Sequence, residues 1–504
     1  MNRVIQKTSM VVALILLSLS LLVVPMDLED RPLQSIMIPI ILSFILAFAF
    51  GKLMVLAYNR STLLFYMILF LFAVILKVLW VNIYATYPSS DYWLYQSIAS
   101  NRANGISWKE LYANDALGYG ALFPHLLNFS TILSYIYRVF GVSHITGQHF
   151  NIVIAFFSGV LLFKFIKLDH KITTAVWACT IFLSFPAYWI FSCILGTENI
   201  FLFFVILFML YFRKYQIVGK KYYLIVSLIS IVASNLIRPI GIIWILTYIL
   251  AMIFIVPRDK KTVLKNSIIL LATFIISSIA IPKIQSGIYG FDISSGSAAY
   301  ALAVGTSWES GGQYSQEILD DVKEDLASHK SFSAIDKKLY SRAENNLTKI
   351  MDSNRLFSFL KIKLSKLMSE TYGYRWYLHN IDVNDPTHPS ERLFSHGQLL
   401  IVSSIGYFFL MLLISIIWLG KNIISREKGK EFDSVFLLSI LINGIILGSM
   451  LLEVQGRYHV SLYIPLCIYA GSAFSWLDGK VAPKFAWFKG KEKGGPHSSI
   501  VKFR

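Results

Sequence analysis

Long apolar stretches separated by short polar segments make up most of the chain. A membrane-spanning helix needs about 20 mostly apolar residues, and about twelve stretches approach that length. They lie at 10–25, 36–57, 62–83, 148–167, 172–192, 196–213, 222–237, 239–256, 264–282, 397–420, 433–452 and 457–476. The pattern predicts an all-α polytopic membrane protein with about 12 transmembrane helices.

Composition favours this fold class over the three soluble domains that 504 residues would otherwise suggest. Hydrophobic residues make up 56% of the chain, charged residues only 15%, and the mean hydropathy is +0.60. A soluble domain carries about 25% charged residues, so the charges are too few to cover this much apolar surface. Disorder, a collagen-like fold and a disulfide scaffold are excluded as well. The cysteines lie in apolar stretches and are interpreted as small core residues: Cys179, Cys193 and Cys467.

Basic residues indicate which ends of the spans face the cytoplasm, because Lys and Arg collect in cytoplasmic loops. The basic loops lie at 164–171, 213–221, 258–265 and 421–430, and both termini are basic. All of them fall on one side only if the apolar segment 121–140 does not cross the bilayer. We therefore predict that this segment lies along the outer interface or dips in and returns, and that both termini are cytoplasmic. The stretch 10–25 has no small-residue cleavage site and is predicted to be a retained anchor.

Two regions are then predicted to lie outside the plasma membrane, namely the loop 84–147 and a mainly helical insertion at 283–396. The charges of the insertion nearly cancel, so the net charge of +17 belongs to the cytoplasmic side. There it orients the chain and interacts with anionic lipid, and no nucleic-acid partner is predicted. The predicted regions are two N-terminal spans at 1–61, a transmembrane core at 62–282, the insertion at 283–396, C-terminal spans at 397–476 and a basic cytoplasmic tail at 477–504.

Two acids in the first outer loop are candidates for acid–base chemistry. Asp91, in Ser90-Asp91-Tyr92, follows the third span at the interface, and Asp115 lies later in the same loop. Together they could supply a base and an orienting partner. The alternative interpretations are a helix N-cap for Asp91 and a turn residue for Asp115.

Three further polar positions interrupt apolar sequence on the same predicted face. Glu198 begins the sixth span, Arg238 precedes a proline between the seventh and eighth spans, and Arg457 lies in Glu453-Val454-Gln455-Gly456-Arg457-Tyr458-His459. A buried acid needs a wet cavity or a cation, and an arginine there could bind a lipid phosphate. The alternatives are a first-turn acid, a snorkelling arginine and a local Glu453–Arg457 ion pair. Gathered on one face, these groups predict chemistry on an anionic, lipid-linked substrate at the outer leaflet.

The chain resembles the GT-C superfamily of integral membrane glycosyltransferases, near the protein O-mannosyltransferase and aminoarabinose-transferase branch. The resemblance rests on the early aspartate in Ser90-Asp91-Tyr92, the proline-bearing segment that ends at Phe140-Gly141, and the late motif Glu453-Val454-Gln455-Gly456-Arg457-Tyr458. It covers about 84–260 and 433–476. Two extra spans before the aspartate loop and an insertion in place of a C-terminal domain depart from the pattern.

The resemblance implies a polyprenyl-phosphate sugar as donor and Asp91 as general base on the hydroxyl of a glycan, lipid or protein acceptor. Displacement would invert the anomeric centre. The predicted substrate-binding residues are Arg238, Arg457, Glu198, Tyr458, His459 and, as an outside candidate, Lys77. The arginines would stabilise the leaving phosphate. No dense acidic cluster is present, so no cofactor and no obligatory metal are predicted.

Two other functions remain open at this point. A flippase or transporter of lipid-linked sugars fits about twelve spans, although transporters usually keep their polar sites near mid-bilayer. An O-antigen-like polymerase or ligase also uses an outer loop and arginines, and a polyprenyl-pyrophosphate donor would distinguish it.

Overall fold

The structure is a computed structural model that describes residues 2–28, 32–84, 86–117, 119–255, 260–294, 298–370, 374, 377–378, 393, 396–425 and 430–485. Every regular element within these ranges is a helix, which confirms the all-α fold class. The last part of the basic tail, from residue 486, lies outside the described residues.

Nine helices in the described ranges are long and apolar enough to span a membrane, and a bent pair makes up to ten. The nine runs are built from α1 (Asn2–Val23), α2 (Met37–Arg60), α3 (Thr62–Phe70) with η3 (Leu71–Ile75) and α4 (Leu76–Ile83), α8 (His144–Ile166), α11 (Glu198–Val218), α14 (Lys260–Tyr289), α21 (Gly397–Ile424), α22 (Lys430–Leu451), and η4 (Gly456–Leu462) with α23 (Tyr463–Phe485). The short helices η1 (Val24–Leu28) and η2 (Leu33–Ile36) connect α1 to α2. The chain is therefore a polytopic membrane protein.

The remaining predicted spans are interrupted or short, and prolines explain two of the breaks. Pro186 separates α9 (Ile172–Ser184) from α10 (Pro186–Cys193), which are bent by 56°. Pro239 follows α12 (Lys221–Ile237) and precedes α13 (Ile242–Ile255), both shorter than a full span. Each of the twelve predicted stretches is thus helical, and the count of twelve spans stays a prediction.

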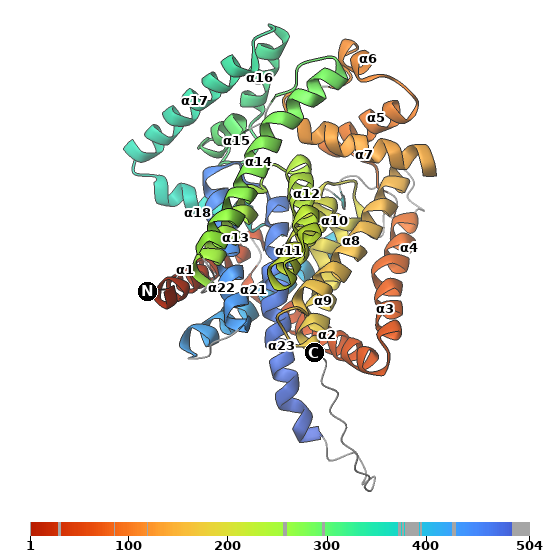
Figure 1. The fold of residues 1–504 in the computed structure, drawn as a ribbon, viewed down its shortest axis with the longest axis vertical. Helices are drawn as coiled ribbons and strands as arrows, with labels where there is room; N and C mark the ends of the chain where they lie inside the picture. The colour runs from red at the N-terminus through yellow and green to blue at the C-terminus, as the bar shows by residue number, and fades with distance from the viewer. Residues whose placement is uncertain are drawn as a thin grey trace.

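One end of the bundle carries the helices of the predicted outer loop. These are α5 (Ser90–Ala103), α6 (Trp108–Ala113) and α7 (Pro124–Phe140), at the upper end of the molecule in Figure 1. We call this the α5–α7 end. The segment predicted to lie at the interface forms α7, which covers 17 residues and is not among the candidate spans of the described residues. Its position relative to the membrane stays a prediction.

The insertion is helical, as predicted, and stands at the same end (Figure 1). Its described helices are α15 (Ala298–Gly305), α16 (Gln316–Ala327), α17 (Phe332–Asp352) and α18 (Leu356–Leu367). A small separate core joins α15, α16 and α17 through Ala303, Ile318 and Ile335, and includes Leu122 from the loop before α7. The predicted turn-rich stretch 379–392 lies outside the described residues.

Burial is uneven across the bundle. Helix α23 is the most enclosed of the candidate spans and packs on α9 and α21, whereas α14 is the least enclosed. The α5–α7 end also contains the break between α12 and α13, because Asn128 of α7 bonds the backbone of Leu236. It contains η4 as well, because Arg457 of η4 bonds Asp91 of α5. This is where the charged residues of the site meet.

Candidate active site

Asp91 lies in the first turn of α5 and is held from two sides. The hydroxyl of Tyr119 donates to its Oδ1 atom at 2.7 Å, and a guanidinium nitrogen of Arg457 donates to Oδ2 at 2.8 Å. Ser90 just before it has a φ of 52°, in the left-handed region that few non-glycine residues adopt. Such strain occurs often at functional sites. A quarter of the Asp91 side chain stays exposed, so its carboxylate can meet a substrate.

Arg457 reaches Asp91 from the other end of the chain. It belongs to η4, directly after the irregular segment 452–455 that follows α22. The two residues are 366 positions apart in the sequence. The acid of the first predicted outer loop and the arginine of the last one therefore form one ion pair.

A second ion pair lies next to the first. Arg238 donates to Glu198 at 2.9 Å, with both side chains largely buried. Arg238 is extended, with φ −145° and ψ 120°, because a residue before proline disfavours the α conformation. Helix α12 therefore ends at this point, and the guanidinium group turns toward the start of α11.

Tyr458 connects the two pairs. The guanidinium carbon of Arg238 lies 5.1 Å from the centroid of the Tyr458 ring, and that of Arg457 lies 5.8 Å from it. Both distances allow a cation–π interaction. We call Asp91, Arg457, Tyr458, Arg238 and Glu198 the outer cluster. It contains two carboxylates, two guanidinium groups and one aromatic ring.

Electrostatics set the charge state of Asp91. Burial raises the pKa of Asp91, but the Arg457 charge and the hydrogen bonds from Tyr119 and Arg457 outweigh it, so the pKa lies below its ordinary value. The pKa of His125, on the first turn of α7, falls to about 4, mainly through burial. Near neutral pH, Asp91 is therefore ionised and His125 is uncharged.

Tyr95 lies within the field of all four charged groups. Burial raises the pKa of its phenol most, Asp91 and Glu198 raise it further, and Arg457 and Arg238 oppose them. These groups are close enough to act on one another, although they come from four separate segments. The shifted pKa values of Asp91, Tyr95 and His125 beside these charges are typical of a functional site.

Three predicted site residues lie away from the outer cluster. Asp115 is exposed in a turn after α6, and its side chain makes no hydrogen bond or ion pair within the described residues. Lys77 is buried in α4, donates to Ser192 at 2.8 Å and lies over the Trp189 ring. His459 is buried against Glu370 at 2.6 Å.

No family model matches the chain, and no curated protein matches it. Among solved structures, it is similar to the archaeal oligosaccharyltransferase AglB from Archaeoglobus fulgidus, determined in complex with an inhibitory peptide and a dolichol-phosphate. The identity is 12% and the TM-score 0.43; the match covers 85% of this chain and 52% of that one. The chain thus spans about half the length of that protein. At this level of similarity the function has to be argued from the residues of the chain itself.

Two residues of the site were not predicted as such from the sequence. Tyr119 bonds Asp91, and His125 lies within the electrostatic reach of Asp91 and both arginines. Both lie in or beside the segment 121–140 that the sequence marks as interfacial, which was the only available signal. Within the described residues, no group of three or more His, Cys, Asp or Glu side chains could hold a metal ion.

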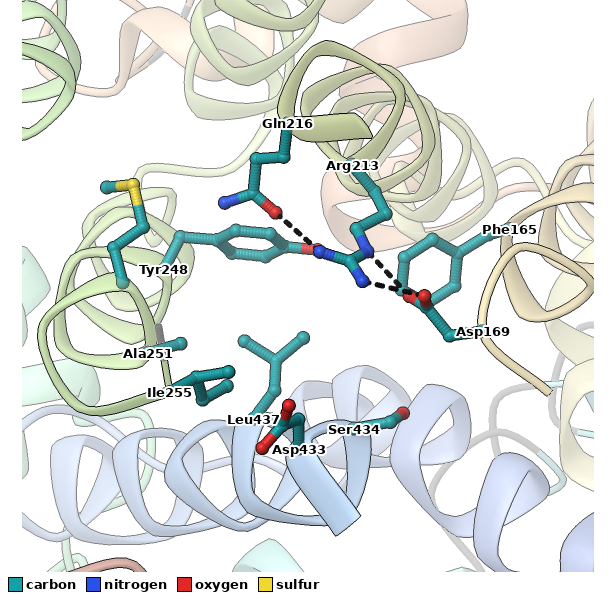
Figure 2. A pocket seen from close by; sticks show the side chains of 11 residues that line it. Phe165, Asp169, Arg213, Gln216, Tyr248, Ala251, Ile255, Asp433, Ser434 and Leu437 are labelled. Carbon is teal, nitrogen blue, oxygen red and sulfur yellow. Dashed lines mark hydrogen bonds and ion pairs between the residues drawn. The ribbon is translucent and has the colours of Figure 1, made fainter. Parts of the chain in front are cut away.

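A charged pocket also lies at the opposite end of the bundle, where α8 and α11 end (Figure 2). Arg213 forms two hydrogen bonds with the carboxylate of Asp169, at 2.6 and 2.7 Å, and a third with Gln216 at 3.1 Å. Asp433 faces the same space, and Tyr248 and Leu437 line it. Phe165, Asp169, Arg213 and Gln216 belong to loops that the sequence predicts to be cytoplasmic, and the other lining residues belong to the predicted spans 239–256 and 433–452.

Proposed function

We propose that the chain is a GT-C glycosyltransferase that moves a sugar from a polyprenyl-phosphate donor to a hydroxyl group of a cell-envelope acceptor. The observation that carries the proposal is the outer cluster. It combines an ionised, partly exposed carboxylate at Asp91 with two arginines that share the ring of Tyr458. One base and two cations are the groups that such a transfer requires.

The chemistry follows from these groups. Asp91 accepts the proton of the acceptor hydroxyl as its oxygen attacks the anomeric carbon of the sugar. The bond between that carbon and the phosphate oxygen breaks, and polyprenyl phosphate leaves with the electron pair. Arg457 and Arg238 stabilise the negative charge that develops on the phosphate. Attack opposite the leaving group inverts the anomeric centre.

The ion pair between Asp91 and Arg457 keeps Asp91 a weak base before the donor binds. A carboxylate held by an arginine has a lowered proton affinity and is a weak base. A donor phosphate competes for Arg457, because a phosphate accepts two parallel hydrogen bonds from a guanidinium group. When Arg457 turns to the phosphate, the proton affinity of Asp91 rises, so donor binding itself prepares the base.

Glu198 has the supporting role in this proposal. It is fully buried, its Oε1 atom accepts from Arg238, and its Oε2 atom accepts no hydrogen bond within the described residues. It orients Arg238 and compensates its charge until the phosphate arrives. Tyr458 keeps the two guanidinium groups apart on one ring. We assign no step to Asp115 or Lys77.

We further propose that the α5–α7 end faces outside and that both termini are cytoplasmic, as the basic loops predict. Single cysteines at Ser143 and Ile217, in a background without Cys179, Cys193 and Cys467, can be probed in intact cells with an impermeant thiol reagent. Position 143 should react without permeabilisation and position 217 only after it. Labelling of position 217 in intact cells would place the outer cluster on the cytoplasmic side.

The function itself is tested with purified protein in proteoliposomes. Polyprenyl-monophosphate sugars should support transfer to a hydroxyl-bearing acceptor or to water, and EDTA should not reduce the rate. The corresponding pyrophosphate-linked sugars should support little transfer. A preference for pyrophosphate donors would favour a polymerase or ligase, and movement of donor across the bilayer without transfer would favour a flippase.

A further inference from the structure

The insertion contacts the segment that leads into Arg457. Segment 452–455 has no helical structure of its own, so its backbone groups need partners elsewhere. The amide of Glu453 donates to the carbonyl oxygen of Ala301 at 2.8 Å, and the amide of Val454 donates to that of Gly312 at 2.9 Å. Both acceptors belong to the insertion.

Lys363, which belongs to the insertion, forms hydrogen bonds with both the insertion and the same segment. This fully buried side chain on α18 donates to the carbonyl oxygen of Gly305 at 2.6 Å and to that of Leu452 at 2.8 Å. Burial lowers the pKa of its amine to about 7, against the opposing charge of Glu453. A buried amine is unfavourable without such partners, so its position depends on these contacts.

Two glycines make the contact close. A Cβ atom on Gly305, the last residue of α15, would lie 2.3 Å from the carbonyl carbon of Leu452. A Cβ atom on Gly312 would lie 2.9 Å from the Cε atom of Lys363. At Gly305 the backbone of the insertion therefore rests directly on the segment, and at Gly312 it rests on Lys363, whose amine bonds the segment.

The insertion also holds the chain on the far side of Arg457. The ring of His459 donates from Nδ1 to the carbonyl oxygen of Leu367 at 2.7 Å, and its Nε2 atom faces the carboxylate of Glu370 at 2.6 Å. Tyr463 donates to the same carboxylate at 2.8 Å, and Ser404 donates to its other oxygen at 2.9 Å. Arg457 thus lies between two anchored points.

We propose that the insertion clamps residues 452–459, and that Lys363 and His459 are positioning residues that hold the backbone of Arg457 beside Asp91, where its side chain reaches Asp91 in the resting site and the phosphate when the donor binds. The catalytic consequence rests on the proposed function, whereas the clamp itself does not. Catalytic groups need to stay within about 0.5 Å of their productive geometry, and a displacement of about 1 Å can cost about 100-fold in rate. An irregular segment could not provide that precision without external contacts.

Two variants loosen the clamp, and each has a matched control. Lys363→Met removes the two hydrogen bonds to carbonyl oxygens, and Gly305→Ala places a methyl group against the backbone of Leu452. Lys338→Met removes an ion pair with Asp325, at 2.9 Å, within the insertion. Gly287→Ala adds a methyl group to α14 where nothing lies within 4 Å. If Lys363→Met does not fold, Gly305→Ala still tests the proposal.

The first readout needs no activity. Hydrogen–deuterium exchange of the full-length protein in detergent or nanodiscs should show amide exchange over 452–458 at least about 10-fold faster in both clamp variants, because two amide donors lose fixed acceptors. Both controls should match the wild-type protein. Unchanged exchange in both clamp variants would overturn the clamp, whether or not the protein transfers sugar.

The second readout links the clamp to Arg457. Per folded molecule, the clamp variants should transfer sugar about 10- to 100-fold more slowly, and the acid limb of their kcat/KM profile should move to higher pH as Arg457 leaves Asp91. A merely structural loss would lower the amount of folded protein without moving that limb. Faster exchange with unchanged transfer and an unchanged limb would overturn the positioning role. A wild-type protein that transfers no sugar would refute the proposed function, and the exchange data would still decide the clamp.

Discussion

The outer cluster and the pocket at the opposite end both pair an arginine with a carboxylate, but they use the pair differently. Arg213 engages both oxygens of Asp169 and also bonds Gln216 (Figure 2), so its guanidinium fork is occupied by the protein. In the outer cluster, one nitrogen of Arg238 bonds one oxygen of Glu198, and one nitrogen of Arg457 bonds one oxygen of Asp91. A bidentate pair fixes the guanidinium group in one orientation, whereas our proposal requires the two arginines that share the Tyr458 ring to turn toward a phosphate.

The surroundings differ in the same way. Asp169 and Arg213 are 44 positions apart, in the turn after α8 and in the second half of α11. The outer cluster joins α5, the start of α11, the α12–α13 break and η4, which only the complete fold brings together. Charge alone therefore does not indicate a reactive site. Two ion pairs from four separate segments that meet on one aromatic ring are the better indication.

The largest expected effect concerns the carboxylate of Asp91 in the outer cluster. Asp91→Asn keeps the size of the side chain and can still bond Tyr119, but it cannot accept a proton as a carboxylate does. Transfer should fall by about 10²- to 10⁴-fold, measured as kcat in proteoliposomes. Asp320→Asn, an exposed acid on α16, is the matched control and should keep the wild-type rate. Full activity of the Asp91→Asn variant would show that Asp91 has only a structural role.

The next effect separates the arginines. Arg238→Ala should reduce kcat/KM for the donor by about 10²- to 10³-fold, as loss of one charge-stabilising donor does elsewhere. Arg238→Lys should recover only part, because lysine lacks the guanidinium fork. Since the variant leaves the buried carboxylate of Glu198 unpaired, the double variant Arg238→Gln/Glu198→Gln controls for that instability. If Arg238→Ala uses the donor as well as the wild-type protein does, the role of Arg238 is only structural.

Arg213→Lys should behave in the opposite manner. It keeps the charge beside Asp169 but loses the bidentate geometry, so we expect stability to fall by about 1 kcal/mol with donor kinetics unchanged. Thermal unfolding and steady-state transfer on the same preparation measure both. If Arg213→Lys reduced donor kinetics as much as Arg238→Lys does, the two regions could not be distinguished by function.

The sequence predicted the fold better than the site. Apolar length predicted the helices of the bundle, because the bilayer requires long uninterrupted runs, and Pro186 and Pro239 mark two breaks. The sequence also indicated Asp91, Glu198, Arg238 and Arg457, because each is a charge beside apolar sequence. It could not predict which acid meets which arginine, because the pairing of Arg457 with Asp91 depends on packing across 366 positions. Nothing in the sequence around Tyr119 and His125 indicates that they lie near Asp91, because only the fold brings them there.

The smallest expected effect is a shift in pH dependence. In the free enzyme, Arg457 keeps the pKa of Asp91 low, so the acid limb of kcat/KM should lie below the ordinary aspartate value of about 3.9. Because a depressed pKa keeps the base ionised to lower pH, loss of Arg457 should move the limb upward. In wild-type protein the limb of kcat, which reports the bound state, should lie above that of kcat/KM. If the acid limbs of kcat and kcat/KM coincided and neither moved in Arg457→Gln, the proposal would be contradicted. Arg457 would then not exchange between Asp91 and the phosphate.

A structure of the protein with bound polyprenyl phosphate, determined by electron cryomicroscopy in nanodiscs, tests the outer cluster most directly. We predict that the phosphate lies between the guanidinium groups of Arg457 and Arg238, that Arg457 has turned from Asp91 to the phosphate, and that the Arg213–Asp169 pair is unchanged. A phosphate in the pocket beside Arg213, with the ion pairs of Asp91 and Glu198 intact, would contradict the assignment of the outer cluster as the active site.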